Sequence, residues 1–293
     1  MVLSAEHRHS RFEHDKMIER YQPRRNDLEL MMSMITLNDR LVAYRLLGDS
    51  HKPLMIMAHP LGMTQNIWDD LLPDLLAEFR VLTWDLPGHG ASGAWPETVT
   101  TVSPQHLAEE ALALARHAGA ERFHFVGTSI GGVIGQQLLA ASSEHLLSVT
   151  LTNTGAQIGT ADAWNTRAAK VRELGLSAMA REIVPRWFGP VACRQQPALL
   201  KGWQHILGQG DAHSYALLCE MLGQTDFRAT LGPCEPLPQL IGGRDDMATP
   251  AATLNELAQI CGAPAPIIMQ DVGHVPAVEA PSQLSALILA HAH

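Results

Sequence analysis

Short, mostly apolar runs alternate along this chain with segments of helical hydrophobic spacing, and this alternation limits the possible folds more than any other feature. Six such runs are present, over residues 53–58, 80–85, 122–126, 147–153, 237–241 and 266–270. Runs of this kind are typical of parallel strands that are buried on both faces. We therefore predict an α/β fold with a mostly parallel sheet and helices on both of its faces.

Strand-like patterns disappear between about residues 155 and 232, where helical patterns take over. We predict one domain over residues 31–293, with a helical cap inserted at about 155–232. Two further segments, 32–37 and 41–47, flank a short polar turn and predict a hairpin. Residues 1–30 carry six basic and six acidic residues and few large apolar ones. We expect a charged extension there, either disordered or helical over His14–Tyr21.

Composition excludes several classes of function. Hydrophobic residues make up 46% of the chain, so a substantial core is expected, and 21 basic against 30 acidic residues give a net charge of −9. That charge argues against a nucleic-acid partner, and no apolar stretch is long enough to span a membrane. Four cysteines lie far apart and cluster with no histidine, so we expect no disulfide framework, metal or cofactor. The N-terminus has no apolar signal segment, and the expected location is the cytoplasm.

The segment Gly127–Gly131 reads Gly-Thr-Ser-Ile-Gly and lies between an apolar run and a helical pattern. A G-x-S-x-G motif in this position is typical of a nucleophile elbow, in which a serine occupies a tight turn between a strand and a helix. The flanking glycines are needed because side chains there would clash. Ser129 is therefore the candidate nucleophile.

A serine needs a base, and the base needs an acid to orient it. In enzymes with such an elbow, the acid and then the histidine follow the serine along the chain. His274 follows the run 266–270, and Asp245 follows the run 237–241, so both are expected at the carboxyl edge of the sheet. Asp246 remains the alternative acid. Asn153, after the preceding run, cannot supply the charge.

The oxyanion of such a reaction needs two backbone N–H donors. Ile130, directly after the serine, opens the helix and is one candidate. The second is expected in the loop that follows the run 53–58, which reads His59-Pro60-Leu61-Gly62. Pro60 has no N–H, so Leu61 is the candidate.

Several stretches resemble the 3-oxoadipate enol-lactonases of the α/β-hydrolase fold. They are DLPGHGAS, HFVGTSIGGVIGQQL, GGRDDMATP and GHVPAVEAP, together with Leu151–Thr160, Trp164–Arg167 and Arg186–Phe188 in the predicted insertion. The resemblance runs from about residue 35 to the C-terminus and supports Ser129, Asp245 and His274 as the triad. This chain differs by carrying His59-Pro60 where these lactonases tend to carry Asn-Ser, and by carrying Thr128 and Ile130 in the elbow.

The function predicted from the sequence is that of a serine hydrolase opening a small ester or lactone through an acyl-enzyme. An anionic lactone would need cations in the cap, and Arg167 and Arg186 are the candidates, with surface salt bridges as their alternative role. Trp164 and Trp187 are expected at the pocket mouth, with core packing as the alternative. A carboxylesterase, another lactonase or a C–C bond hydrolase on the same scaffold remains open, as does a non-catalytic binding protein. The oligomeric state is left open.

Overall fold

The computed structural model describes residues 32–293, which form one sheet of eight strands in the order β1-β2-β4-β3-β5-β6-β7-β8. Its strands are β1 (Ser33–Leu37), β2 (Arg40–Leu47), β3 (Leu54–Ala58), β4 (Arg80–Trp84), β5 (Phe123–Thr128), β6 (Leu146–Thr152), β7 (Gln239–Gly243) and β8 (Ile267–Met269). β1 and β2 pair antiparallel with each other, and β2 pairs antiparallel with β4. All pairs from β4 through β8 are parallel. The fold class predicted from the alternating runs is confirmed.

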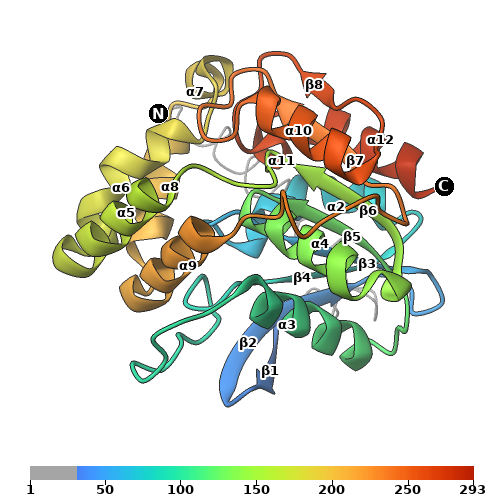
Figure 1. The fold of residues 1–293 in the computed structure, drawn as a ribbon, viewed down its shortest axis with the longest axis horizontal. Helices are drawn as coiled ribbons and strands as arrows, with labels where there is room; N and C mark the ends of the chain where they lie inside the picture. Colours follow the sequence, from blue (N-terminus) through green and yellow to red (C-terminus); the bar gives the residue numbers. More distant parts are fainter. Residues whose placement is uncertain (1–31) are drawn as a thin grey trace, which may run out of the picture. The chain divides into compact units, whose positions relative to one another are not determined.

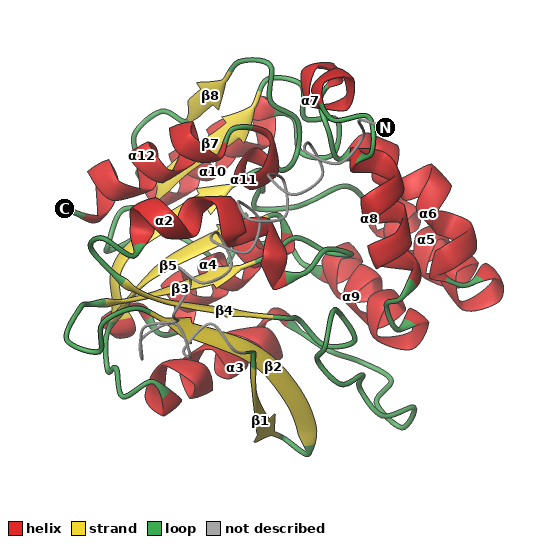
Figure 2. Ribbon diagram, turned by 180° about the vertical axis from the view of Figure 1, so that it is seen from behind, coloured by secondary structure: helices red, strands yellow, loops and turns green. Residues whose placement is uncertain are grey.

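Helices cover both faces of this sheet. One face carries α3 (Pro104–His117), α4 (Ile130–Ala141) and α10 (Ala251–Cys261), which lie in front of the strands in Figure 1. The opposite face carries the 3₁₀ helix η2 (Gln65–Leu71), α2 (Leu72–Leu75) and α12 (Pro281–Ala292), as Figure 2 shows from behind. The short helices η3 (Ser143–His145) and α11 (Pro276–Glu279) complete this part of the chain. The sheet is thus enclosed between two helical layers, which is why every residue of its central strands β3 and β5 is buried.

Between β6 and β7 the chain forms helices and no strand. These elements, called the helical insertion below, are α5 (Ala161–Leu174), α6 (Leu176–Ile183), η4 (Val184–Arg186), α7 (Pro190–Gln195), α8 (Leu199–Gly208) and α9 (Ala212–Gln224). α5 packs against α9, and α6 packs against α8. Both views place these helices to one side of the sheet rather than on its faces (Figures 1 and 2).

Several boundaries follow from local chemistry. The pair Ser103-Pro104 predicts a helix start, with the helix running to about His117, and α3 begins at Pro104 and ends at His117. Pro104 suits the first turn because it lacks only an N–H that would have no partner there. The N–H of Ser103 donates to Nδ1 of His106 over 3.1 Å, which closes a capping box around that turn. The helix therefore has its start specified by adjacent residues.

The helical spacing of apolar residues over Asn66–Phe79 predicts a single helix, and that prediction is wrong. The chain there forms η2 followed by the single turn α2, with Pro73 in the first turn of the latter. Proline cannot donate a main-chain hydrogen bond, so an uninterrupted α-helix through Pro73 would lose a bond and crowd the preceding turn. The apolar spacing survives this break, because Ile67, Trp68 and Leu71 remain buried.

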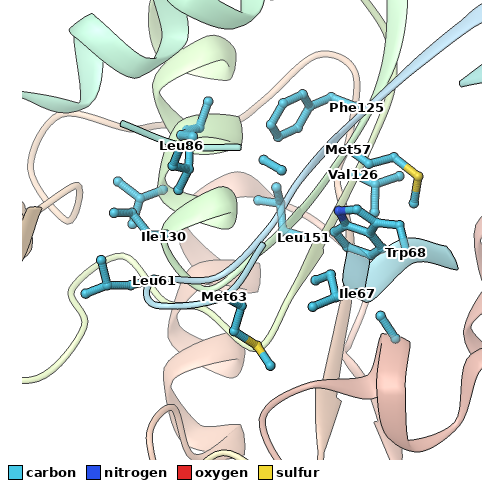
Figure 3. Packing of buried hydrophobic residues seen from close by; sticks show 14 of the residues in the cluster. Met57, Leu61, Met63, Ile67, Trp68, Leu86, Phe125, Val126, Ile130 and Leu151 are labelled. Carbon is cyan, nitrogen blue, oxygen red and sulfur yellow. The ribbon is translucent and has the colours of Figure 1, made fainter. Parts of the chain in front are cut away.

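The core extends to the edge of the sheet where the parallel strands end. One buried cluster joins side chains from separate loops and helices, among them Leu61, Leu86 and Ile130. Met57 and Trp68 belong to the same cluster (Figure 3). The loops at this edge are thus anchored by apolar packing. Within residues 32–293 no helix is long and apolar enough to cross a membrane. The expectations for residues 1–30, including a helix over 14–21, lie outside the described residues.

Candidate active site

Ser129 lies in the turn between β5 and α4, at the carboxyl edge of the sheet. Its backbone has φ 59° and ψ −114°, a left-handed conformation that is strained for a residue with a side chain. A Cβ atom at Gly127 would clash with the carbonyl of Gly131, and one at Gly131 would clash with the carbonyl of Ala58. Both glycines of the motif are thus required by the turn. This geometry is that of a nucleophile elbow.

His274 follows β8 and lies at the same edge. Its Nδ1 is 2.9 Å from Oδ2 of Asp246, and both side chains are buried. The carboxylate bonded to His274 is thus that of Asp246, the alternative acid, and not that of Asp245, which the sequence analysis preferred. Asp245 is half-buried, and its backbone N–H donates to the carbonyl of Val272 over 2.9 Å.

Asp246 is selected by the turn that follows β7. Its Oδ1 accepts hydrogen bonds from the N–H groups of Ala248, at 2.7 Å, and Thr249, at 3.0 Å. Its Oδ2 accepts one from the Thr249 hydroxyl at 2.6 Å. An aspartate that bonds the N–H two and three residues ahead forms an Asx turn. The stretch Asp246-Met247-Ala248-Thr249 fits that turn and is the sequence signal that would have distinguished the two aspartates.

The electrostatics of Asp246 favour the ionised form. Burial alone would raise the pKa of this carboxyl group. The charge of His274, with the hydrogen bonds from His274 and Thr249, outweighs burial and holds the pKa well below its usual value. A carboxylate that stays ionised can hold the imidazole with its proton on Nδ1, which leaves Nε2 free to accept a proton.

Asn153 also belongs to this site, although an amide cannot supply the charge of the acid. It directly follows β6, with φ 49°, and is fully buried. Its Nδ2 donates to Oδ2 of Asp246 and to the carbonyl of Gly273, both over 2.9 Å. Asn153 therefore links the acid to the loop that carries His274.

Glu279 supports the same loop from α11. Its carboxylate accepts hydrogen bonds from the N–H groups of Gly273, at 2.9 Å, and Val275, at 3.1 Å, which flank His274 in the chain. A third comes from the N–H of Gly189 in the helical insertion, at 2.7 Å. Burial raises the pKa of Glu279 despite these donors. One half-buried carboxylate thus connects the histidine loop to the insertion.

The candidate oxyanion donors lie on two sides of Ser129. Ile130 begins α4, where main-chain N–H groups have no partner in the helix and carry partial positive charge. Leu61 lies in the loop after β3 and lines the same cavity as Ser129 and His274. Among the hydrogen bonds of residues 32–293, none uses the N–H of Leu61 or of Ile130. Both groups are therefore available to a ligand.

A cavity of about 120 Å³ lies between the sheet edge and the helical insertion. It is lined by Leu61, Ser129, Ile158, Gly159, Ala163, Trp164, Arg167, Ile183, Arg186, Trp187, Tyr215, Ala248 and His274. All four candidate substrate residues of the insertion are among them. The guanidinium of Arg167 lies 4.8 Å from the ring centroid of Trp164, and Trp187 is buried. Neither Arg167 nor Arg186 forms an ion pair with any acidic residue of the described chain.

Two buried histidines follow β3 and β4. Burial lowers the pKa of His59. For His89, burial and the charge of His59 lower the pKa to about 4, although the carboxylates of Asp85 and Asp211 act in the opposite direction. The described residues contain no cluster of three or more His, Cys, Asp or Glu side chains suited to a metal ion. Both imidazole rings form hydrogen bonds with main-chain groups.

The lowered pKa of His89 predicts a loss of stability in acid. Between pH 6.5, the ordinary pKa, and pH 4, the unfolded chain binds a proton that the folded chain does not, so stability falls as the pH falls through this range. The contribution from this residue between pH 7 and pH 5 is about 2 kcal/mol. Urea unfolding at pH 7 and pH 5 measures the loss of unfolding free energy between the two pH values. This loss should be smaller in His89→Gln than in the wild type by about 2 kcal/mol. An unchanged loss would contradict the assignment.

The fold and this site define the class of the protein. Residues 55–287 match the alpha/beta hydrolase family, and the chain belongs to that family. It is a hydrolase with an α/β-hydrolase fold.

Among its relatives, 3-oxoadipate enol-lactonase 2 of Acinetobacter baylyi is 33% identical over 221 residues, which are 74% of this chain and 80% of the relative. The crystal structure of the enol-lactonase from Burkholderia xenovorans LB400 superposes with a TM-score of 0.80 at 27% identity, covering 88% of this chain and 99% of that one. A pimeloyl-[acyl-carrier protein] methyl ester esterase of Aeromonas hydrophila is 27% identical, over 80% of this chain and 94% of its own length.

Proposed function

We propose that this hydrolase opens a small ester or lactone through an acyl-enzyme on Ser129, with His274 as general base and Asp246 as the acid that orients it. One observation carries the proposal: Ser129, on its strained elbow, lines the same cavity as His274, whose Nδ1 is bonded to the buried carboxylate of Asp246. Strain at a serine that faces a cavity beside a carboxylate-bound histidine favours nucleophilic catalysis over a binding role.

The reaction follows from these positions. Ser129 Oγ attacks the ester carbonyl while Nε2 of His274 takes its proton, and the carboxylate of Asp246 stabilises the imidazolium. The N–H groups of Leu61 and Ile130 bind the oxyanion. His274 then returns the proton to the leaving oxygen as the acyl-enzyme forms, and water, activated by the same histidine, hydrolyses it. In an enol-lactone the leaving enol becomes a ketone, which makes ring opening effectively irreversible.

The cavity favours a small, negatively charged substrate. Its volume of about 120 Å³ is well below the roughly 300–1,000 Å³ of pockets that take drug-sized ligands. Arg167 and Arg186 line it without an acidic partner in the described chain, and a carboxylate on the substrate would supply one. Together with the similarity to 3-oxoadipate enol-lactonases, this supports a lactone that carries a carboxylate.

Replacement of Arg167 tests that substrate charge. In Arg167→Met we expect the KM for 3-oxoadipate enol-lactone to rise about 10- to 100-fold, because the substrate carboxylate would lose one charge-assisted hydrogen bond. The KM for the uncharged ester p-nitrophenyl acetate should change little. Arg172→Met, on the same helix, is the matched control, because Arg172 pairs with Glu220 and does not line the cavity. An equal effect on both substrates would contradict a role for Arg167 in binding the carboxylate.

A carboxylesterase is the second candidate, and the similarity to a methyl ester esterase over 94% of that relative's length supports it. Both candidates share the same catalytic groups, so only substrate preference separates them. We would compare kcat/KM for 3-oxoadipate enol-lactone with that for p-nitrophenyl acetate and for short methyl esters. A preference for the lactone supports the first proposal. A preference for open-chain esters would replace it with the second.

A further inference from the structure

Two loops at the carboxyl edge of the sheet are cross-linked by a reciprocal pair of histidines. His59, in the loop after β3, accepts a hydrogen bond at Nε2 from the N–H of Leu86, in the loop after β4, over 2.9 Å. His89, in the β4 loop, accepts one at Nε2 from the N–H of Gly62, in the β3 loop, over 3.0 Å. Each loop thus supplies one histidine that binds the main chain of the other.

These bonds specify the tautomer of both rings. Because each Nε2 accepts a main-chain N–H, the proton of each neutral imidazole must be on Nδ1. Nδ1 of His59 then donates to the carbonyl of Pro60 over 2.8 Å, and Nδ1 of His89 donates to the carbonyl of Pro87 over 2.9 Å. Both rings are buried, with 0% and 4% of their surfaces exposed, and both nitrogens of each ring are satisfied.

The contacts fall on the two peptide groups that flank Leu61. His59 binds the carbonyl of Pro60, which belongs to the same planar peptide as the N–H of Leu61. In a trans peptide the C=O and N–H point in opposite directions, so holding that carbonyl also directs the N–H of Leu61. His89 binds the N–H of Gly62, which belongs to the peptide group that joins Leu61 to Gly62. Gly62 itself has φ +84°. A hydrogen bond to an amide carbonyl also polarises its N–H, which makes it a stronger donor.

We propose that His59 and His89 are positioning residues, which orient and polarise the Leu61 N–H toward the oxyanion of the reaction. They act through the peptide groups on either side of Leu61 and touch no substrate themselves. The inference rests on the proposed function, because an oxyanion donor has a role only if Ser129 attacks a carbonyl. It adds to that function two buried histidines, His59 and His89, that hold the peptide groups on either side of Leu61.

Amide substitutions can separate the two nitrogens of each ring. An asparagine places its Nδ2 near the position of histidine Nδ1, and a glutamine places its Oε1 near the position of Nε2. At position 59 the bond to Pro60 uses Nδ1, so His59→Asn should keep kcat within about threefold while His59→Gln lowers it about 10- to 100-fold. At position 89 the bond to Gly62 uses Nε2, so His89→Gln should keep kcat and His89→Asn should lower it. The upper end of this range approaches the loss of one oxyanion donor.

In this crossed pattern, asparagine is tolerated only at position 59 and glutamine only at position 89. The pattern distinguishes a positioning role from simple structural support. Reduced folding would lower the amount of active enzyme in all four variants, whereas misdirected Leu61 N–H groups lower kcat selectively and leave KM little changed. The affinity for a boronic acid that forms a tetrahedral adduct on Ser129 should fall in parallel with kcat. The matched control is His124→Asn, because His124 is a buried histidine near the start of β5 whose Nδ1 lies 2.8 Å from the Ser148 hydroxyl. It should leave kcat unchanged.

Equal effects of asparagine and glutamine at both positions would overturn the inference. If the wild-type protein opens no ester or lactone, the proposed function and the inference fail together. If it does but the pattern is not crossed, only the inference fails. A second measurement needs no variant: ¹⁵N chemical shifts of the wild-type imidazoles should report the Nδ1–H tautomer for both His59 and His89 at neutral pH. Nε2–H signals for either ring would contradict the inference even where a substituted protein does not fold.

Discussion

Ser129→Ala is expected to lower kcat for esters and lactones by about 10⁶-fold, the largest effect of any single substitution in this protein. The hydroxyl oxygen is the atom that forms the acyl-enzyme, and neither His274 nor Asp246 can replace it. Turnover that remains should come from the oxyanion donors and the cavity, which stabilise attack by water. Steady-state kinetics on p-nitrophenyl acetate and on the enol-lactone measure the loss.

The matched control is Ser148→Ala. Ser148 is a buried serine in β6 whose hydroxyl contacts His124, and its replacement should leave kcat within about threefold while costing about 1 kcal/mol of stability. The elbow itself should not collapse in Ser129→Ala, because its strain resides in the backbone of the turn and not in the hydroxyl. Full activity in folded Ser129→Ala would exclude this serine as the nucleophile.

Asp246→Asn is expected to lower kcat by about 10⁴-fold, whereas Asp245→Asn should leave it within about threefold. Asp246 accepts hydrogen bonds from His274, Asn153, Ala248 and two groups of Thr249. An asparagine would bring an N–H₂ donor into this set of donors. To bond the new side chain, His274 would have to move its proton to Nε2, where it could no longer accept the proton of Ser129.

The paired comparison is the sharpest test of the corrected acid, because the two aspartates are adjacent in the chain and carry the same charge. Both variants should be folded at neutral pH, which thermal unfolding can verify before kinetics are measured. Asp246→Asn should lose activity at every pH at which the wild type is active. A large loss in Asp245→Asn with little loss in Asp246→Asn would contradict the observed hydrogen bonding.

The parts of the fold that the sequence predicts well are those that adjacent residues specify. α3 begins at Pro104 and ends at His117 as expected, since Ser103 caps it and Pro104 opens it. The run 53–58 contains β3, whose five residues are all buried. The helix expected over Asn66–Phe79 differs from the structure. Apolar spacing describes which residues face the core, and it is satisfied equally by a 3₁₀ helix that ends at Leu71 and a separate helical turn that contains Pro73.

The residues of the candidate site also fall into two groups: those that local sequence patterns indicate and those that they do not. Ser129 can be found because its motif and both of its neighbouring elements lie within residues 123–141. His274 and the aspartate pair can be found from their places after strands. The choice between Asp245 and Asp246 depends on the rotation of one turn after β7, which hydrophobic patterning does not describe. Asn153 and Glu279 act across long sequence separations, so no local pattern indicates their partners.

The central claim is that Ser129 is a nucleophile activated by His274 and Asp246. Intact-protein mass spectrometry after reaction with a fluorophosphonate, followed by peptide mapping, tests it directly. We predict a single phosphonyl adduct on Ser129 in the wild type, no adduct in Ser129→Ala, and labelling slowed by orders of magnitude in Asp246→Asn but not in Asp245→Asn. An adduct on another residue, or equal labelling of Ser129→Ala, would contradict it.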